Sequence, residues 1–439
     1  MGDDRVKRVL AEMVAADRDL GQLAEGVYES LTWGKGIEVI DQARVQYFAW
    51  YELPTKWLIP DSDRPKMLRA AAELFDRLDL ARFAEVCRSA TTAGVHAAFG
   101  RSHKAGVEAF RRAEQQSGID PPNLDDFAWG SVMGMEESSA RSHIARSLEE
   151  AIVAGRFTPG RRGWKTEAAA VTAEVLDGPH PSMPGQSHRS AIVTERLHNW
   201  LHGVEGRSPI LHDLRSRHAN RLLHPISPPE DLDDRMEPLA WLLDGIGDGV
   251  TLTSAGYLPT ALVAGAFERF NWTEIWIGSP RSEADLVPLL EVHDLLRRAG
   301  AVRRRGRTEK LSSRWQAMRR DTEAMWRALA AALSGSDWDR AVAEVYTLLL
   351  VDGVSATDAL DAAATAALVE YGWNVGGVLP RERDVSYAWW ETARPLLALG
   401  GFDRESRHSF RNVELSVFGL ATLLEHVRAH ATGPRSSPW

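Results

Sequence analysis

The chain has 439 residues, of which 44% are apolar, and it carries a formal net charge of −9. At roughly 150 residues per domain, this length predicts about three domains, and the apolar content is sufficient to fill their cores. The acidic balance excludes a protein coated by nucleic acid over its whole surface, because phosphate binding needs a surplus of Lys and Arg. Any contact with nucleic acid would therefore be made by a local basic patch.

No apolar run approaches the ~18 to 20 residues that a membrane helix needs. The first residues, Met1 to Arg5, lack both the apolar core and the cleavage site of a signal peptide. We therefore expect a cytoplasmic protein without a membrane partner. The single cysteine, Cys87, excludes an internal disulfide and lies in a helical pattern, which favours a small buried side chain.

Residues 1–204 are predicted to be almost wholly helical, because apolar residues recur at three- and four-residue spacing and no run alternates with period two. Pro65 stands just inside one predicted helix start, and a long apolar stripe stops at Gly155. We interpret this half as an irregular helical array, which could divide near residue 121. We expect the aromatic group around a proline turn to be core, namely Tyr47, Phe48, Trp50, Tyr51 and Trp57.

Between residues 205 and 236 the periodic pattern gives way to glycines, prolines and acidic residues, which predicts a linker and the main domain boundary. We expect the acidic run to be solvated, or alternatively to screen a basic segment of the same chain; it comprises Glu230, Asp231, Asp233 and Asp234. The tail, residues 432–439, is rich in Pro, Gly and Ser and is predicted to be disordered.

The segment 237–335 is predicted to be a winged-helix-like domain, because its elements follow the order helix, short strand, helix, helix, strand, turn and strand. The predicted elements are helices Pro238 to Ile246, Leu258 to Phe270 and Ser282 to Ala299, and a hairpin from Ala301 to Leu311.

A similar pattern recurs 101 residues later, which predicts a second such domain over residues 336–431. Leu295-Leu296, for example, matches Leu396-Leu397. The predicted fold class is therefore mainly α, with an N-terminal irregular helical array followed by two tandem winged-helix-like domains. The second set comprises helices Arg340 to Val351, Thr357 to Tyr371 and Asp384 to Leu399, and a hairpin from Phe402 to Leu415.

The first predicted hairpin is crowded with arginine, whose fixed charge and paired donors suit phosphate oxygens. The preceding helix opens with Glu283 and Asp285, which would repel phosphate and are expected to cap the helix. The hairpin is therefore the better candidate for binding, although a solvated hairpin, or one paired to acidic neighbours, is the alternative. The candidate nucleic-acid-binding residues are Arg297, Arg298, Arg303, Arg304, Arg305, Arg307 and Lys310.

Enzyme signatures are weak in this sequence. It has no Gly-x-Ser-x-Gly elbow, and its glycine-rich stretch, Gly245 to Gly249, lacks the spacing of a nucleotide-binding loop. Five histidines, His198, His202, His212, His218 and His224, lie close together in the sequence. The first two have the i, i+4 spacing of metal ligands, and His212 or Asp213 could supply a third. Because Asn199 stands where a zinc protease has its glutamate, we expect no catalytic residues, metal or cofactor.

Residues Gly249 to Pro259, the pairs Leu295-Leu296 and Ala299-Gly300 and the basic hairpin resemble the C-terminal region of actinobacterial insertion-element passenger proteins. The resemblance extends to about residue 430 and covers somewhat under half of the chain. It implies tandem winged-helix-like domains in a mobile-element setting and carries no residue roles. Those proteins usually have a β-rich domain ahead of this region, whereas the preceding residues here are predicted to be helical.

Together these patterns predict a non-enzymatic regulatory or accessory protein that binds DNA through the first hairpin. The alternative is a protein-interaction scaffold or homo-oligomer that does not bind nucleic acid. A hydrolase or metalloenzyme built on the histidine cluster is the least favoured hypothesis.

Overall fold

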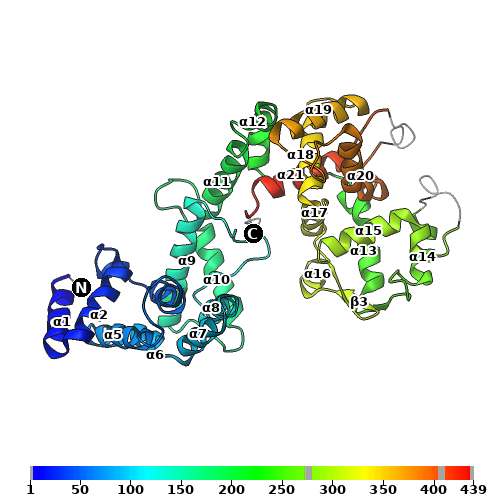
Figure 1. Cartoon of the computed structure of the whole chain (residues 1–439). Coiled ribbons are helices and arrows are strands. Elements are labelled where there is room, and N and C mark those ends of the chain that lie inside the picture. Colours follow the sequence, from blue (N-terminus) through cyan, green and yellow to red (C-terminus); the bar gives the residue numbers. More distant parts are fainter. Residues whose placement is uncertain (1–2, 271, 273–278, 404–410, 436–439) are drawn as a thin grey trace. The chain divides into compact units, whose positions relative to one another are not determined.

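A computed structural model describes residues 3–270, 272, 279–403 and 411–435 of the chain (Figure 1). These residues are mainly helical and include one small three-stranded sheet, which confirms the predicted mainly α class. The chain divides into two compact units, Met1–Ile192 and Val193–Pro438. Among the described residues, no helix combines the length and apolar character needed to cross a bilayer.

The first unit is an array of helices with three hydrophobic clusters. Pro65 lies at the start of α5, and the apolar stripe before Gly155 lies on α9, as predicted. The elements are α1 Asp3–Ala16, α2 Arg18–Thr32, η1 Ile37–Val39, α3 Gln42–Tyr47, the π-helix η2 Phe48–Glu52, α4 Leu53–Thr55, α5 Arg64–Arg77, α6 Ala81–Arg88, α7 Ala90–Arg101, α8 His103–Ser117, α9 Met135–Val153, α10 Trp164–Asp177 and α11 His188–His202, which continues into the second unit.

The predicted aromatic core is confirmed in part: Phe48 and Trp50 are buried and Trp57 packs against their cluster, whereas Tyr47 and Tyr51 are half-buried. The Trp50 indole Nε1 donates a hydrogen bond to Thr92 Oγ1 at 2.7 Å. Cys87 is also buried, and burial raises the pKa of its thiol to about 12. The buried aromatic side chains and Cys87 therefore contribute to core packing, and neither has the solvent exposure that a reactive site needs.

The predicted linker over residues 205–236 contains a regular helix, and the division between the two units falls earlier, after Ile192. Ser208 caps and Pro209 begins a regular helix, α12 Pro209–Leu223, whose apolar side chains are buried. Proline is well tolerated in the first turn of a helix, so this proline starts an element instead of breaking one. The acidic run leads into α13 Leu232–Ile246. Asp233 and Asp234 occupy its first turn, where their negative charges interact favourably with the positive end of the helix dipole. Within the predicted disordered tail, Thr432 is buried and accepts a hydrogen bond from Arg196, whereas residues 436–439 lie outside the described residues.

The second unit contains the three-stranded sheet, whose strand order is β1-β3-β2 with both pairs antiparallel. The helix predicted from Ser282 is interrupted at Leu286, and Pro288 stands in the first turn of the longer helix that follows. The first segment comprises α13, β1 Val250–Thr251, α14 Thr260–Phe270, η4 Glu283–Asp285, α15 Val287–Arg298, β2 Val302–Arg305, β3 Thr308–Leu311, α16 Ser313–Met318 and α17 Thr322–Ala331.

The later segment is helical, and isolated bridges in it pair Phe402 with Leu415 and Ala356 with Asn412. The remainder of the predicted second hairpin, residues 404–410, lies outside the described residues. The helices are α18 Asp337–Val351, α19 Thr357–Tyr371, α20 Glu382–Ala398 and α21 Val417–Ala431. They share one hydrophobic core with the first segment.

A buried chain of charged side chains connects the hairpin to α15. His293 has no exposed surface, and its Nδ1 lies 2.5 Å from Glu283 Oε1 while its Nε2 lies 2.6 Å from Glu309 Oε2. The other oxygen of Glu309 accepts from Arg297 Nε at 3.0 Å, and Glu283 Oε2 accepts from the Leu258 backbone N–H at 2.6 Å. The charge network formed by Glu283, His293, Arg297 and Glu309 therefore joins η4, α15, β3 and the entrance to α14.

The protonation state of His293 follows from its partners. Ionised carboxylates only accept hydrogen bonds, so an imidazole held between two of them carries hydrogen on both nitrogens. Burial opposes this charge, but the hydrogen bonds to Glu283 and Glu309 prevail and raise the pKa of His293. Burial likewise opposes ionisation of Glu309, but His293 and Arg297 lower its pKa. Two carboxylates and two cations then balance within the network.

Replacing His293 by Leu should lower the free energy of unfolding of this segment by about 3 to 5 kcal/mol, because it leaves two buried carboxylates without their shared partner. Chemical denaturation followed by hydrogen–deuterium exchange of residues 252–311 measures the loss. The exposed His224 provides the control, since its replacement by Gln should change stability by less than about 0.5 kcal/mol. Equal effects of the two substitutions would contradict a structural role for His293.

The contribution of this network to stability should depend on pH in both directions. The folded pKa of His293 lies above its ordinary 6.5, so its stabilising effect is complete below pH 6.5 and is lost as the pH rises through the folded value. The folded pKa of Glu309 lies below its ordinary 4.5, so its effect is present above pH 4.5 and is lost on acidification. Exchange protection of β3 should be greatest between these values. In the His293→Leu variant, exchange protection of β3 should not decline between pH 6.5 and 9. A decline in that variant would show that another group causes the pH dependence.

Candidate nucleic-acid interface

The basic hairpin consists of β2 and β3, joined by the two-residue turn Gly306 and Arg307. Gly306 has φ +64°, a left-handed conformation that glycine adopts without steric cost. The register pairs Arg303 with Lys310 and Arg305 with Thr308. Because directly paired residues share one face of a sheet, these four residues lie on the same side of the hairpin.

That outer face carries the exposed cations Arg303, Arg305 and Lys310. Within the described parts of the chain, none of the three forms an ion pair. The opposite face holds Val302, Glu309 and Leu311, which are buried. The hairpin thus directs positive charge outward from one face and anchors itself through the other.

Arg304 and Arg307 brace the hairpin itself. Arg304 Nε donates to the Gly306 carbonyl at 2.8 Å, across the turn. Arg307 donates from Nε and Nη2 to the Leu252 carbonyl at 3.1 and 2.9 Å, which ties the turn to the segment after β1. Both guanidinium groups therefore have part of their donor capacity committed to backbone oxygens.

The remaining two arginines lie at the end of α15 and not on the hairpin. Arg297 belongs to the charge network and also donates to the Gly256 carbonyl at 3.2 Å. Arg298 donates to the Leu333 carbonyl at 2.5 Å, and burial lowers its pKa. With Arg314 it borders a surface hollow of about 410 Å³, whose lining also includes Ala299, Ala328, Ala331, Ala332, Ser334 and Gly335. The seven predicted site residues thus fall into three groups. The outer set, on the exposed face of the hairpin, comprises Arg303, Arg305 and Lys310. Arg304 and Arg307 stabilise the hairpin turn, and Arg297 and Arg298 lie at the end of α15.

The helix before the hairpin, α15, is packed against another helix. α15 packs against α20, and Glu291 lies 3.9 Å from Arg394 of that helix. Burial raises the pKa of Glu291. Asp285 has the expected capping role and accepts from the backbone N–H groups of Arg281 and Ser282. Glu283 does not cap but is buried in the charge network, so the prediction for that residue was wrong.

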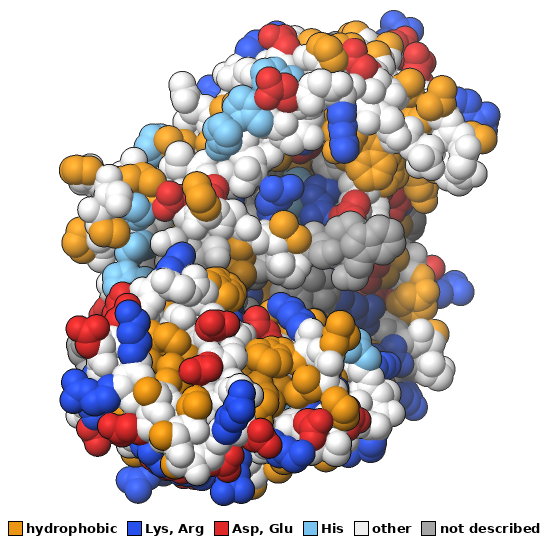
Figure 2. Space-filling view, turned by 60° about the vertical axis from the view of Figure 1, so that its left-hand side comes forward, with side chains coloured by type: hydrophobic (Ala, Val, Ile, Leu, Met, Phe, Trp, Pro, Cys, Tyr) orange, Lys and Arg blue, Asp and Glu red, His pale blue; other side chains and the backbone are white. Residues whose placement is uncertain are grey.

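Charged side chains of both signs are mixed on one face of the protein (Figure 2). On the face seen in Figure 2, Lys and Arg side chains alternate with Asp and Glu and do not gather into one continuous basic area. This distribution agrees with the net charge of −9 and with binding by a patch of limited extent.

Sequence reasoning missed His293 and Glu309, although both carry a signal. Glu309 stands two residues before Leu311 in a strand, so the two side chains share a face. His293 lies four residues after Leu289 and three before Leu296, on the apolar stripe of α15. A histidine and a glutamate that both face the core predict a buried pair.

Comparison of the chain with protein-family models, with curated proteins and with solved structures found no match.

Proposed function

We propose that this chain is a non-enzymatic regulatory or accessory DNA-binding protein whose first hairpin contacts the phosphate backbone. The observation that carries the proposal is the outer face of the hairpin, where Arg303, Arg305 and Lys310 are exposed without acidic partners among the described residues. A rigid support holds this face in place, because Glu309 on the same strand is locked to α15. Fixed cations on a braced hairpin suit contacts that position a protein on a duplex without reading its sequence.

The arrangement of elements supports a winged-helix-like module over residues 232–311. A helix, a short strand and two helices precede the hairpin, and the first strand adds to the edge of β3. The later segment, α18 to Leu415, supports a tandem copy through its matching helix order and strand bridges. The resemblance to the insertion-element passenger proteins agrees with this interpretation. Because α15 is packed against α20, the proposed contact is made by the hairpin and not by the third helix.

The proposal predicts salt-dependent binding to duplex DNA of arbitrary sequence. Fluorescence anisotropy with a labelled duplex should show binding at low salt, with a linear fall of log K against log salt concentration. The triple variant Arg303→Ala, Arg305→Ala, Lys310→Ala should bind more weakly and have a slope smaller by about 2 to 3, because each lost cation removes one phosphate contact.

A matched control separates this local effect from the change in net charge. Arg161, Arg162 and Lys165 are exposed in the first unit, and their replacement by Ala removes the same three charges. The control variant should keep the wild-type slope. An equal loss of affinity in both variants, or no binding by the wild type at low salt, would refute the proposal.

A protein-interaction scaffold is the second candidate function. It is favoured by a group of exposed apolar side chains between α19 and the first half of α20: Val375, Val378, Leu379 and Tyr387. Val378 and Leu379, which are adjacent in the chain, and Tyr387 are each 60 to 64% exposed, which is unusual for large apolar residues. A second copy of the chain could cover such a surface.

The scaffold hypothesis predicts a stable oligomer that depends on this surface. Sedimentation velocity at micromolar concentration should show self-association of the wild type, and the double variant Val378→Ser, Leu379→Ser should shift it to monomer while the helical content stays unchanged. A wild-type protein that is monomeric at all accessible concentrations would count against the scaffold and leave the DNA-binding proposal unaffected.

A further inference from the structure

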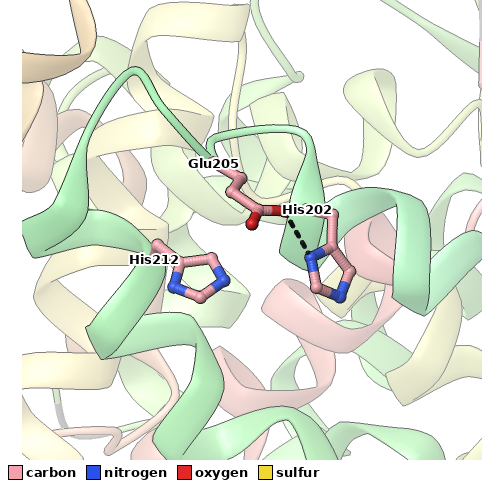
Figure 3. A group of neighbouring side chains, drawn as sticks. All are labelled: His202, Glu205 and His212. Atoms are coloured by element: carbon pink, nitrogen blue, oxygen red, sulfur yellow. Dashed lines mark hydrogen bonds and ion pairs between the residues drawn. The ribbon is translucent and has the colours of Figure 1, made fainter.

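A cluster of metal-ligand side chains lies where α11 ends and α12 begins, in the second unit. His202 is the last residue of α11, Glu205 lies in the connecting turn, and His212 lies in the first part of α12. One ligand atom from each side chain lies within 4.8 Å of the others. Figure 3 shows the carboxylate of Glu205 and the ring of His212 directed toward His202.

The turn that brings these residues together is firmly held on both sides. Val204 and Ser208 are buried, so the chain between the helices is fastened to the core. The Ser208 hydroxyl accepts from the Leu211 N–H at 3.1 Å and donates to Glu370 Oε2 at 2.6 Å. The cluster is therefore presented by a formed scaffold, and binding of an ion would not require the connection to fold.

The polar atoms of the cluster are incompletely satisfied. His202 Nδ1 lies 2.9 Å from Glu205 Oε2, so these two groups already face each other. His212 Nε2 is buried and lacks a hydrogen-bond partner among the described residues. A buried polar atom left without a partner costs about 1 to 3 kcal/mol, which coordination of a cation would recover.

We propose that His202, Glu205 and His212 form a binding site for a divalent transition-metal ion, with zinc as the expected occupant. Two imidazoles and one carboxylate are a ligand set that zinc uses when a fourth position stays open. Magnesium and calcium prefer oxygen ligands, so the two nitrogens select against them. This site is separate from the hairpin and does not depend on its proposed function.

The geometry needs only a small closure to accept the ion. Zinc bonds of about 2.0 to 2.2 Å place tetrahedral ligands roughly 3.3 to 3.6 Å apart. Ligand atoms at the 4.8 Å limit would approach by up to about 1.5 Å, and His202 Nδ1 and Glu205 Oε2, now 2.9 Å apart, would separate slightly. His202 and Glu205 are exposed, so rotation of their side chains can supply this movement.

A second histidine group lies in the first unit and serves as an internal comparison. There, His180 Nε2 bonds to Glu136 Oε2 at 2.9 Å, and His143 Nδ1 lies 3.2 Å from His188 Nε2. The His180 and His188 rings also lie 4.9 Å apart between their centroids, so these side chains contact one another. Within residues 3–270, 272, 279–403 and 411–435, the cluster at His202 is the one set of three that meets the mutual 4.8 Å distance.

The test uses the full chain without a histidine tag, titrated with Zn²⁺ by calorimetry and with Co²⁺ by visible absorption. The wild type should bind one ion per chain and give the intense d–d bands of four-coordinate Co²⁺. The variant His202→Gln, His212→Gln should lose these bands, and Glu205→Gln should weaken binding at least about tenfold. The neighbouring Asp213→Asn and the exposed His224→Gln are the matched controls and should bind as the wild type does.

The proposal would be overturned if the wild type bound neither ion stoichiometrically at micromolar concentration, or if the variant His202→Gln, His212→Gln bound as tightly as the wild type. It would also be overturned if the Co²⁺ bands disappeared in the variant His143→Gln, His188→Gln and remained in the variant His202→Gln, His212→Gln. Glu205 is exposed and its replacement leaves the core untouched, so loss of binding in that variant cannot come from unfolding.

Discussion

Three buried charged side chains, Glu283, His293 and Glu309, together with the half-buried Arg297, hold the first hairpin to the helix beside it. An isolated buried ion carries a desolvation cost of several kcal/mol, so each member of the Glu283, His293, Arg297 and Glu309 network requires the others. Glu309 belongs to β3, His293 and Arg297 to α15, and Glu283 to the turn that precedes it. Hydrogen bonds have direction, unlike apolar contacts, so the network sets the orientation of the hairpin as well as its stability.

This arrangement explains why one arginine-rich segment contains groups with different roles. The strand alternation that turns Glu309 toward the core turns Lys310 and its partner Arg303 outward. Arg297 neutralises the buried carboxylates, and Arg307 closes the turn on the Leu252 carbonyl. The outward cations give a local positive face on an acidic protein. Since α15 is covered by α20, such a face would bind a duplex through its backbone rather than by reading bases.

The sequence predicted most helices after α12 and the first hairpin, because helix periodicity and the glycine turn are local signals, but it predicted a linker where α12 forms. It failed for charged residues, because the sequence does not show whether a charged side chain is exposed or buried. Asp233 and Asp234 are predicted in a linker but stand in the first turn of α13, while Glu283 is predicted to cap a helix but is buried in the charge network. The site was predicted as one basic group because spacing along the chain does not show which cations meet a carboxylate from another element.

The histidine cluster illustrates the same limit. The i, i+4 spacing of His198 and His202 is visible in the sequence, but the ligands that gather around His202 come from a turn and from the next helix. Only the reversal of the chain after Gly203, held by the buried Ser208, brings His212 back to it. Local patterns thus identified the residue types, and the packing of the connection determined which of them meet.

The protonation state of His293 shows whether the buried charge network exists. Proton–nitrogen correlation spectra of the full chain, with only its histidines labelled with ¹⁵N, report the state of both ring nitrogens. We predict that one histidine, absent from the spectrum of the His293→Leu variant, carries hydrogen on both nitrogens at neutral pH and titrates above the ordinary 6.5. A His293 that is neutral at this pH, or that titrates at or below 6.5, would contradict the buried charge network.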